Sequence, residues 1–405
     1  MGYKMSSAYL ILADGTVFQG KAIGLEGTTI GETVFTTGMT GYLETLTDPS
    51  YFGQIVTQTF PLIGNYGVIP QDFESKKSWV RGYIVREICD EPSNFRCQET
   101  LDKFLKDQKI TGIFGIDTRA LTKRLRESGV MNGMIISSVN EAPKITDELL
   151  QKIKDYKIQN AVETVSCNDG VCEVLFSDKT GSETKLVSEA FLLPGLSQDV
   201  FATPPSPKGT PLKNPVNFHI VLWDFGAKAN IQRELEKRGC KVTVVPSDTT
   251  ADQILKLNPD GLMLSNGPGD PADNTGIIGE IKKICDYAKL PIFGICLGHQ
   301  MLALARGAKT SKLKYGHRGG NHPVKDTQTD RVYITSQNHG YAVENTSLPA
   351  YAKMSFFNVN DGTVEGITYT DIPAFSVQFH PEACGGPHDT NFLFDRFMEC
   401  IEGNK

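Results

Sequence analysis

Between residues 218 and 295, short apolar runs alternate with amphipathic segments, and this alternation restricts the possible folds more than any other feature of the chain. Buried strands are predicted for "FHIVLWDFG", "CKVTVVPS", "GLMLSNG" and "PIFGI". Helices are predicted for "KANIQRELEKRG", "TADQILKLNPD" and "GIIGEIKKICDYAK". In the first of these, Ile231 and Leu235 share a face and Gly239 is suited to cap the end. The pattern indicates an α/β fold with an open, mostly parallel sheet and flanking helices on both faces.

The pattern changes on both sides of this region. After "GHQMLALARGA" the strand-like runs "RVYITSQ", "GITYT" and "AFSVQFH" predict an antiparallel extension of the sheet, and "NFLFDRFMECI" predicts a closing helix. Residues 8–70 contain short β-rich runs with frequent glycines, and residues 98–108 and 118–128 are predicted to be helical. The N-terminal half is therefore expected to be a mixed α/β domain rich in strands.

Proline and glycine in "PPSPKGTPLKNP", residues 204–215, forbid a helix and predict a linker. We therefore expect an N-terminal domain at residues 1–150, a connecting segment at 151–216 that adds a helix and a few strands, and a C-terminal domain at 217–403.

Composition narrows the functional classes. A formal net charge of −6 and the lack of a Lys/Arg stripe argue against nucleic-acid binding. The nine cysteines have neither CxxC pairs nor zinc-finger spacing, which favours a reducing compartment. No signal peptide or long apolar span is visible, so we expect a cytoplasmic protein with no membrane partner.

Cys296 lies in "PIFGICLGHQ", where a predicted strand meets a predicted helix. Gly294 and Gly298 flank it as in a nucleophile elbow, a strained turn that exposes the central side chain. A helix N-terminus would lower the pKa of the thiol, and the N–H of Leu297 could stabilise an oxyanion. The alternative is that Cys296 is a buried core thiol, as most free cysteines are.

A second strand end, "AFSVQFHPEA", supplies His380 and Glu382. A thiol nucleophile needs a base, and the base needs a carboxylate to orient it. We therefore predict that Cys296, His380 and Glu382 meet at one edge of the sheet.

A third strand end, "LMLSNGPGDPAD", carries Gly267 and Gly269 in a loop whose N–H groups could complete an oxyanion hole. No phosphate-binding GxxxxGK[ST] motif occurs, so this chain is not expected to bind ATP. Another glycine-rich segment, "GHRGGNHP", offers a competing interpretation, a metal site at His317, His322 and His339. Because their spacing fits no common zinc pattern and glycine-rich loops hold ligands poorly, no metal is expected.

"LSNGPGDP", "GICLGHQ" and "QFHPE", in this order, resemble the signature strand ends of class I (triad) glutamine amidotransferases. "GETVFTTGMTGYLETLTDPSYFGQIV", "SNFR", "GIDTRALTKRLRESG", "DFGAKANI", "GHRGGNHPVKD" and "SQNHGYAV" extend the resemblance to the small, glutaminase subunits of carbamoyl-phosphate synthase. The similarity covers nearly the whole chain except about residues 150–215.

This resemblance implies that Cys296 attacks the glutamine amide and forms a thioester, that His380 moves the proton and that Glu382 orients His380. It implies backbone N–H groups of Gly269 and Leu297 for the oxyanion. The residues implied in binding L-glutamine are Gly267, Gly269, Leu297, Gln300, Asn338, Gly340 and Tyr341.

The resemblance also implies a partner. Ammonia would pass through a protein tunnel to a large subunit, in a heterodimer or higher assembly, and that subunit would use ATP and Mg²⁺ to make carbamoyl phosphate from bicarbonate. No cofactor is implied for this chain.

Two positions depart from the family pattern, Gly38, where bacterial members have a serine that contacts glutamine, and Leu43, where glutamine is common. Two alternatives stay open, a catalytically silent regulatory or assembly partner, and a free-standing cysteine hydrolase. The pathway served, arginine or pyrimidine synthesis, and the role of Cys384 are left open by the sequence.

Overall fold

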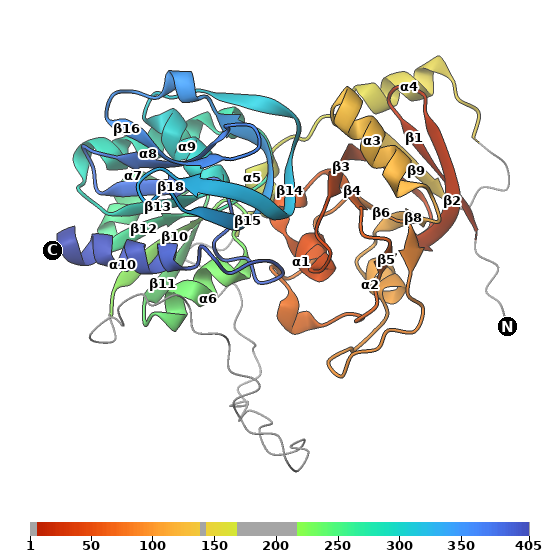
Figure 1. The fold of residues 1–405 in the computed structure, drawn as a ribbon, viewed down its shortest axis with the longest axis horizontal. Coiled ribbons are helices and arrows are strands. Elements are labelled where there is room, and N and C mark those ends of the chain that lie inside the picture. Colours follow the sequence, from red (N-terminus) through yellow and green to blue (C-terminus); the bar gives the residue numbers. More distant parts are fainter. Residues whose placement is uncertain (1–5, 138–142, 168–216, 405) are drawn as a thin grey trace, which may run out of the picture.

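The computed structural model describes residues 6–137, 143–167 and 217–404. Two bodies lie side by side, one built from the N-terminal residues and one from residues 217–404 (Figure 1). The predicted linker at 204–215 lies outside the described residues. So does most of the predicted connecting segment, of which the helices α4 (Asp147–Lys154, beginning just before it) and α5 (Ala161–Val165) are described.

The N-terminal body is a closed barrel of seven strands, in the order β1-β2-β8-β6-β4-β3-β9. The strands are β1 (Ser7–Leu12), β2 (Val17–Gly24), β3 (Thr28–Thr36), β4 (Gln54–Gln58), β6 (Gly82–Val85), β8 (Thr111–Phe114) and β9 (Met131–Ser137). Strands β3, β4, β6 and β8 pair in parallel, and the other pairs are antiparallel. A small second sheet joins β5 (Leu62–Ile63) to β7 (Glu87–Ile88).

The helices α1 (Tyr42–Thr47), α2 (Leu101–Asp107) and α3 (Thr118–Ser128) pack on this barrel. So does α4, whose Ile153 is buried against Ile11 and Met134. The predicted helices at 98–108 and 118–128 are thus confirmed, with α2 shorter at its start. Leu121 and Leu125, four residues apart on α3, are fully buried in the barrel core with Ile84 and Ile113. The prediction of a mixed α/β domain rich in strands is correct, although nothing in the sequence showed that the strands close into a barrel.

The C-terminal body is built on a nine-stranded sheet in the order β11-β10-β12-β13-β18-β17-β16-β14-β15. Its parallel half holds β10 (His219–Asp224), β11 (Lys241–Pro246), β12 (Gly261–Leu264), β13 (Ile292–Ile295) and β18 (Ala374–Val377). Its antiparallel half holds β14 (Thr310–Asp326), β15 (Val332–Val343), β16 (Ala352–Asn358) and β17 (Val364–Tyr369).

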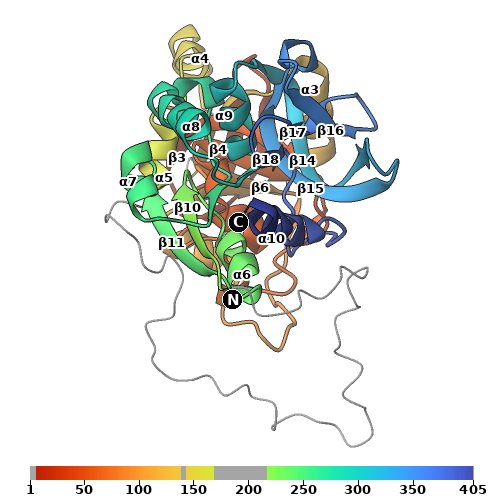
Figure 2. The ribbon, with the colours of Figure 1, turned by 90° about the vertical axis from the view of Figure 1, so that its left-hand side faces the viewer.

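Helices cover both faces of this sheet, as predicted (Figure 2). The side chains of β10 alternate between two hydrophobic cores, one on each face of the sheet. Val221 and Trp223 belong to the core under α7 (Ala251–Lys256), α8 (Thr275–Tyr287) and α9 (Leu297–Ala305). Ile220 and Leu222 point to the other face, into the core under α6 (Ala229–Lys237) and α10 (Phe392–Asn404).

Two strand predictions need correction. "AFSVQFH" was expected in the antiparallel extension, but β18 pairs in parallel with β13 and only its other edge, toward β17, is antiparallel. "GHRGGNHP" was expected to be a glycine-rich loop, but it lies within the 17-residue strand β14. Its glycines fall at register shifts against β15, where bulges accommodate them.

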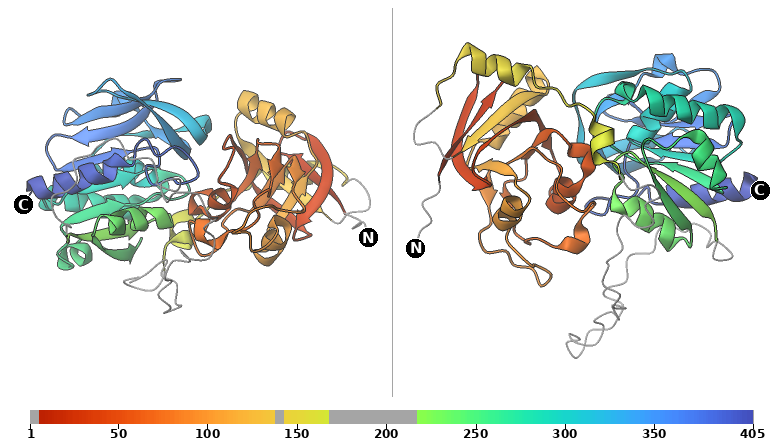
Figure 3. Two further views of the ribbon diagram at one scale, coloured as in Figure 1. Left: turned by 60° about the horizontal axis from the view of Figure 1, so that its bottom comes forward. Right: turned by 180° about the vertical axis from the view of Figure 1, so that it is seen from behind.

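Hydrogen bonds and ion pairs join the two bodies, which Figure 3 shows from two further sides. Thr37 N donates to Arg318 O at 3.1 Å, Val130 N donates to Lys314 O at 2.9 Å, and Lys312 Nζ lies 2.6 Å from Glu32 Oε1. Strand β14 therefore runs along the barrel.

Eight cysteines of the described ranges are free thiols. No helix among the described residues is long and apolar enough to cross a membrane.

Candidate active site

Cys296 lies between the end of β13 and the start of α9, in a backbone conformation that L-residues rarely adopt, with φ of 53°. The glycines on either side make this turn possible. A Cβ on Gly298 would clash with the carbonyl of Leu264, and a Cβ on Gly294 would lie 3.0 Å from the backbone of Gly298. The structure thus contains the sharp strand-to-helix turn that the sequence predicted.

The thiol of Cys296 is buried, with 2% of the residue exposed. Its Sγ donates to Asn338 O and accepts from Gln378 Nε2, both at 3.6 Å. Burial raises the pKa of the thiol to about 12, although Lys228 and the Leu297 N–H favour the thiolate. The expectation of a lowered pKa is wrong for the unliganded site, because desolvation outweighs the helix N-terminus.

His380 and Glu382 follow β18, the strand beside β13, so the ends that carry Cys296 and His380 are neighbours. His380 Nδ1 lies 2.7 Å from Glu382 Oε1, and both side chains are buried. His380 Nε2 has no hydrogen-bond partner in the described part of the chain. The pair has the geometry of a base oriented by a carboxylate, with the second ring nitrogen available.

Lys228, directly before α6, is a buried cation that the sequence reasoning missed. Its Nζ lies 3.2 Å from Glu382 Oε1 and 3.7 Å from Asp48 Oδ2. Burial alone would raise the pKa of Glu382, but Lys228 and His380 hold it at about 2, so that Glu382 stays ionised. The sequence signal for this residue is the lysine in "DFGAKANI", a segment that resembles the family but has no predicted chemical role.

A cavity of about 490 Å³ lies over Cys296. It is lined by six of the seven residues predicted to bind glutamine: Gly267, Gly269, Gln300, Asn338, Gly340 and Tyr341. The seventh, Leu297, is buried next to Cys296 and would contribute only its backbone N–H. Residues predicted from three separate segments therefore converge on one site.

The loop after β12 approaches this cavity closely because it is rich in glycine. A side chain on Gly267 would clash with the carbonyl of Phe225, and Gly269 has a φ of 89°. Asn266 anchors the loop: its side chain accepts from Lys228 N at 3.0 Å and donates to Gly226 O at 3.0 Å and to Ser50 Oγ at 2.9 Å.

The barrel contributes residues to the same site, which sequence reasoning also missed. Ser50 lines the cavity with Cys296. Asp48 Oδ2 accepts from Asn338 Nδ2 at 3.1 Å, and its Oδ1 accepts from Ser50 N at 2.9 Å. Asp48 and Asn338 are 290 residues apart in the chain, and a single sequence without local spacing gives no signal for their contact.

A second cavity of about 300 Å³ is lined by His380, Lys228, Gly38 and Cys384, none of which lines the first cavity. Gly38, where relatives were expected to present a serine to glutamine, therefore lies in a different cavity from Cys296. Cys384 is exposed, and its Sγ accepts from Asn230 Nδ2 at 3.0 Å. The cavity with the predicted glutamine-binding residues contains Cys296 and lacks Cys384.

Comparisons with known proteins show which family the chain belongs to. A family model described as "Carbamoyl-phosphate synthase small chain, CPSase domain" matches residues 10–135, and one described as "Glutamine amidotransferase class-I" matches residues 221–400. The carbamoyl phosphate synthase small chain of Clostridium perfringens is 48% identical over 392 residues, which cover 97% of this chain and 99% of that protein. The chain belongs to the carbamoyl phosphate synthase small chain family.

Two further members of this family show the same full-length similarity. The small chain of Listeria monocytogenes is 48% identical over 402 residues, which cover 99% of this chain and 98% of that protein. The small chain of Fusobacterium nucleatum is 47% identical over 401 residues, with 99% of both chains covered. In this small chain, the barrel carries the family's own domain and the nine-stranded sheet is its class I glutamine amidotransferase domain.

Proposed function

We propose that this small chain hydrolyses L-glutamine with a Cys296–His380–Glu382 triad and passes the ammonia to a large subunit that makes carbamoyl phosphate. One observation carries the proposal. A buried cysteine on a strained elbow shares a cavity with six residues predicted to hold glutamine, beside a His380–Glu382 pair.

In the first step, Cys296 Sγ attacks the carboxamide carbon of glutamine and a C–S bond forms. The thiol proton moves to His380 Nε2, which is free to accept it, and Glu382 stabilises the resulting imidazolium. The N–H groups of Leu297 and Gly269 hold the oxyanion. His380 then returns the proton to the leaving nitrogen, the C–N bond breaks, and ammonia and a glutamyl thioester result.

Water then attacks the thioester, and His380 takes one of its protons. The C–S bond breaks, the proton returns to sulfur, and glutamate is released. Because the thiol has a pKa of about 12 in the free site, we place its deprotonation in the same step as the attack and not in a pre-formed thiolate.

The lining of the cavity suits an amino-acid zwitterion. Lys312 and Arg318 supply positive charge, and Glu32 and Asp270 supply negative charge. Gln300 Nε2 already donates to Tyr341 O at 2.7 Å and to Gln378 Oε1 at 2.9 Å, so its carbonyl oxygen is the group left to meet the substrate.

We place the beginning of the ammonia path in the second cavity, because His380, the proton donor to ammonia, lines it and Asn338 lines both cavities. ATP, Mg²⁺ and bicarbonate would be handled by the large subunit, which the words "small chain" in the relatives' names imply. This chain is proposed to need no cofactor for the hydrolysis and to work in the cytoplasm.

The test is glutamate release from glutamine by the purified chain, wild type against Cys296→Ala, each with and without the candidate large subunit. We expect release by the wild type, faster with the large subunit, and none by the variant. Silence of the wild type even in the complex would favour a purely regulatory or assembly role. Cleavage of peptides without hydrolysis of glutamine would favour a free-standing cysteine hydrolase.

A further inference from the structure

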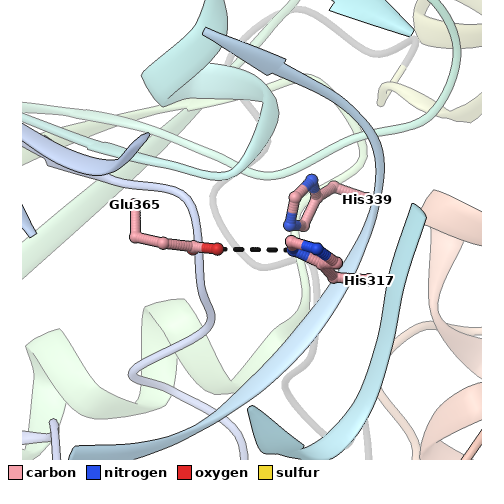
Figure 4. A group of neighbouring side chains, drawn as sticks. All are labelled: His317, His339 and Glu365. Atoms are coloured by element: carbon pink, nitrogen blue, oxygen red, sulfur yellow. Dashed lines mark ion pairs between the residues drawn. The ribbon is translucent and has the colours of Figure 1, made fainter. Parts of the chain in front are cut away.

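His317, His339 and Glu365 form a buried group on three strands of the antiparallel half-sheet, β14, β15 and β17 (Figure 4). One ligand atom from each residue lies within 4.8 Å of the others. None of the three has a role in the proposed hydrolysis, and His317 and Glu365 lie outside the residues that line the cavity over Cys296.

The hydrogen bonds of His317 leave one nitrogen facing Glu365. Its Nε2 lies 2.8 Å from Asp361 Oδ2, and a carboxylate can only accept, so Nε2 carries the hydrogen. Its Nδ1 has no hydrogen-bond partner among the described residues and lies 3.4 Å from Glu365 Oε1. In the neutral ring the Nδ1 lone pair points toward the carboxylate. Against the opposing effect of burial, Asp361 and Glu365 raise the pKa of His317 to about 9, so a metal ion at Nδ1 would replace a proton there.

His339 is held through the other ring nitrogen, so that its Nε2 is the atom left available. Its Nδ1 lies 2.8 Å from the carbonyl oxygen of Tyr341, so Nδ1 carries the hydrogen and Nε2 offers a lone pair. Gln337 Oε1, also an acceptor, lies 3.0 Å from that Nε2. Two acceptors at this distance repel each other unless the amide rotates or a cation lies between them.

Glu365 completes the group. It is fully buried, Asn358 Nδ2 donates to its Oε1 at 3.2 Å, and its Oε2 has no hydrogen-bond partner in the described ranges. An unpartnered carboxylate oxygen in a dry interior is costly unless a proton or a metal ion satisfies it.

We propose that His317 Nδ1, His339 Nε2 and Glu365 bind one divalent transition-metal ion, with Zn²⁺ as the preferred ion and Gln337 Oε1 as a neighbouring oxygen. Two histidines and a carboxylate are a common zinc ligand set. Asp361 and the Tyr341 carbonyl then act as the outer partners that fix the tautomer and ring orientation of metal-binding histidines.

The distances need only a modest contraction. Bonds of ~2.1 Å in a tetrahedral site place ligand atoms ~3.4 Å apart, and the atoms here lie within 4.8 Å of one another. Side-chain rotations of the three residues, each on a different strand, can close that gap. The ion would tie three strands together beside Asn338, whose carbonyl accepts from the thiol of Cys296.

The first experiment is calorimetric titration of the full-length chain with Zn²⁺ after treatment with a chelator. We expect one ion per chain with a Kd of ~1 µM or tighter, and a rise in Tm of about 5 °C at a hundredfold excess over Kd. Glu365→Gln and His317→Asn should each weaken binding by at least about tenfold, whereas His388→Asn, at an exposed histidine, should not.

The visible absorption spectrum of bound Co²⁺ tests the proposal even if Glu365→Gln and His317→Asn fail to fold. The wild type and the Cys384→Ser chain should show the same visible d–d bands, without the intense thiolate charge-transfer band that a cysteine ligand gives. No stoichiometric binding below ~100 µM Zn²⁺, or equal binding by folded Glu365→Gln and His317→Asn chains, would overturn the proposal. The group would then be satisfied by a proton on His317 and a rotated Gln337 amide.

Discussion

Lys228 and Glu382 form a buried ion pair, with Nζ 3.2 Å from Oε1, and the same carboxylate oxygen lies 2.7 Å from His380 Nδ1. One oxygen therefore contacts both the permanent cation of the site and the proposed base. This arrangement keeps Glu382 ionised in a dry environment, as a carboxylate that orients an imidazole must be.

Removing the cation should disturb both catalysis and stability. In Lys228→Met, Glu382 and Asp48 lose their buried partner, and we expect the free energy of unfolding to fall by ~3–5 kcal/mol. Glutamate release should fall by about tenfold or more, up to the ~10²–10⁴ that a general base contributes. Lys228→Arg, which keeps the charge, is the matched control and should lose less of both.

Lys228→Met should also change how stability and activity depend on pH. The pKa of Glu382 is lowered to about 2 in the folded chain, so its ionised form stabilises the fold above about pH 4.5, and this stabilisation is lost as pH falls through about 2. Without Lys228, that loss should begin at higher pH, and the acid limb of the rate profile should move up with it. Overlapping acid limbs for wild type and Lys228→Met would show that Lys228 does not control Glu382.

Glu74 should make the chain less stable as the pH rises from about 4.5 to about 8. Burial raises its pKa to about 8, against the opposing effect of Lys228. Because the folded state holds this proton more tightly than the unfolded state, stability should decline from about pH 4.5 to about pH 8, by up to ~1.4 kcal/mol per unit. Glu74→Gln should flatten this decline in urea titrations; an equally steep decline in the variant would rule out Glu74 as its source.

The elbow should not tolerate a methyl group at Gly298. In Gly298→Ala the new Cβ would clash with the Leu264 carbonyl, forcing α9 away from β12. We expect loss of glutaminase activity and ~1–3 kcal/mol of stability. Gly279→Ala, on the exposed side of α8 where a Cβ meets nothing within 4 Å, is the control and should gain ~0.5–1 kcal/mol.

The two thiols near the site should behave differently. Cys296→Ser should abolish glutamate release, because a buried hydroxyl is a far weaker nucleophile than the thiol it replaces. Cys384→Ser should retain activity within about twofold, since Cys384 lies in the other cavity and contacts Asn230 and Glu44. The reverse result would identify Cys384 as the nucleophile and would require a different substrate position.

The sequence predicted the C-terminal sheet well because buried strands and amphipathic helices have distinct periods that can be read locally. The elbow at Cys296 and the ends of β12 and β18 could be found for the same reason, since each combines glycine or proline with a reactive side chain. The roles of the triad and the glutamine-binding residues stay predictions, although most of these residues share one cavity.

What could not be predicted depends on contacts between distant segments. Nothing near Lys228, Asp48 or Glu365 in the chain indicates that they would be buried with charged partners. The pKa of Cys296 was predicted in the wrong direction because a helix N-terminus is visible in sequence, whereas the degree of desolvation is not. The glycines of "GHRGGNHP" suggested a loop because glycine usually weakens a strand. Pairing with the long strand β15, which lies later in the chain, keeps this segment extended, with bulges at the glycines.

Asp48 follows α1 in the N-terminal body, yet its carboxylate accepts from Asn338 of the sheet and lies 3.7 Å from Lys228 Nζ. Asn338 supplies the carbonyl that accepts from the thiol of Cys296, and Lys228 supplies the charge beside Glu382. We therefore expect a small rotation of the N-terminal body against the sheet to misalign the proposed nucleophile and base together. In the proposed hydrolysis, the seating of the N-terminal body on the sheet would then set the rate of ammonia release, so that a partner gripping that body would act on the site from outside it.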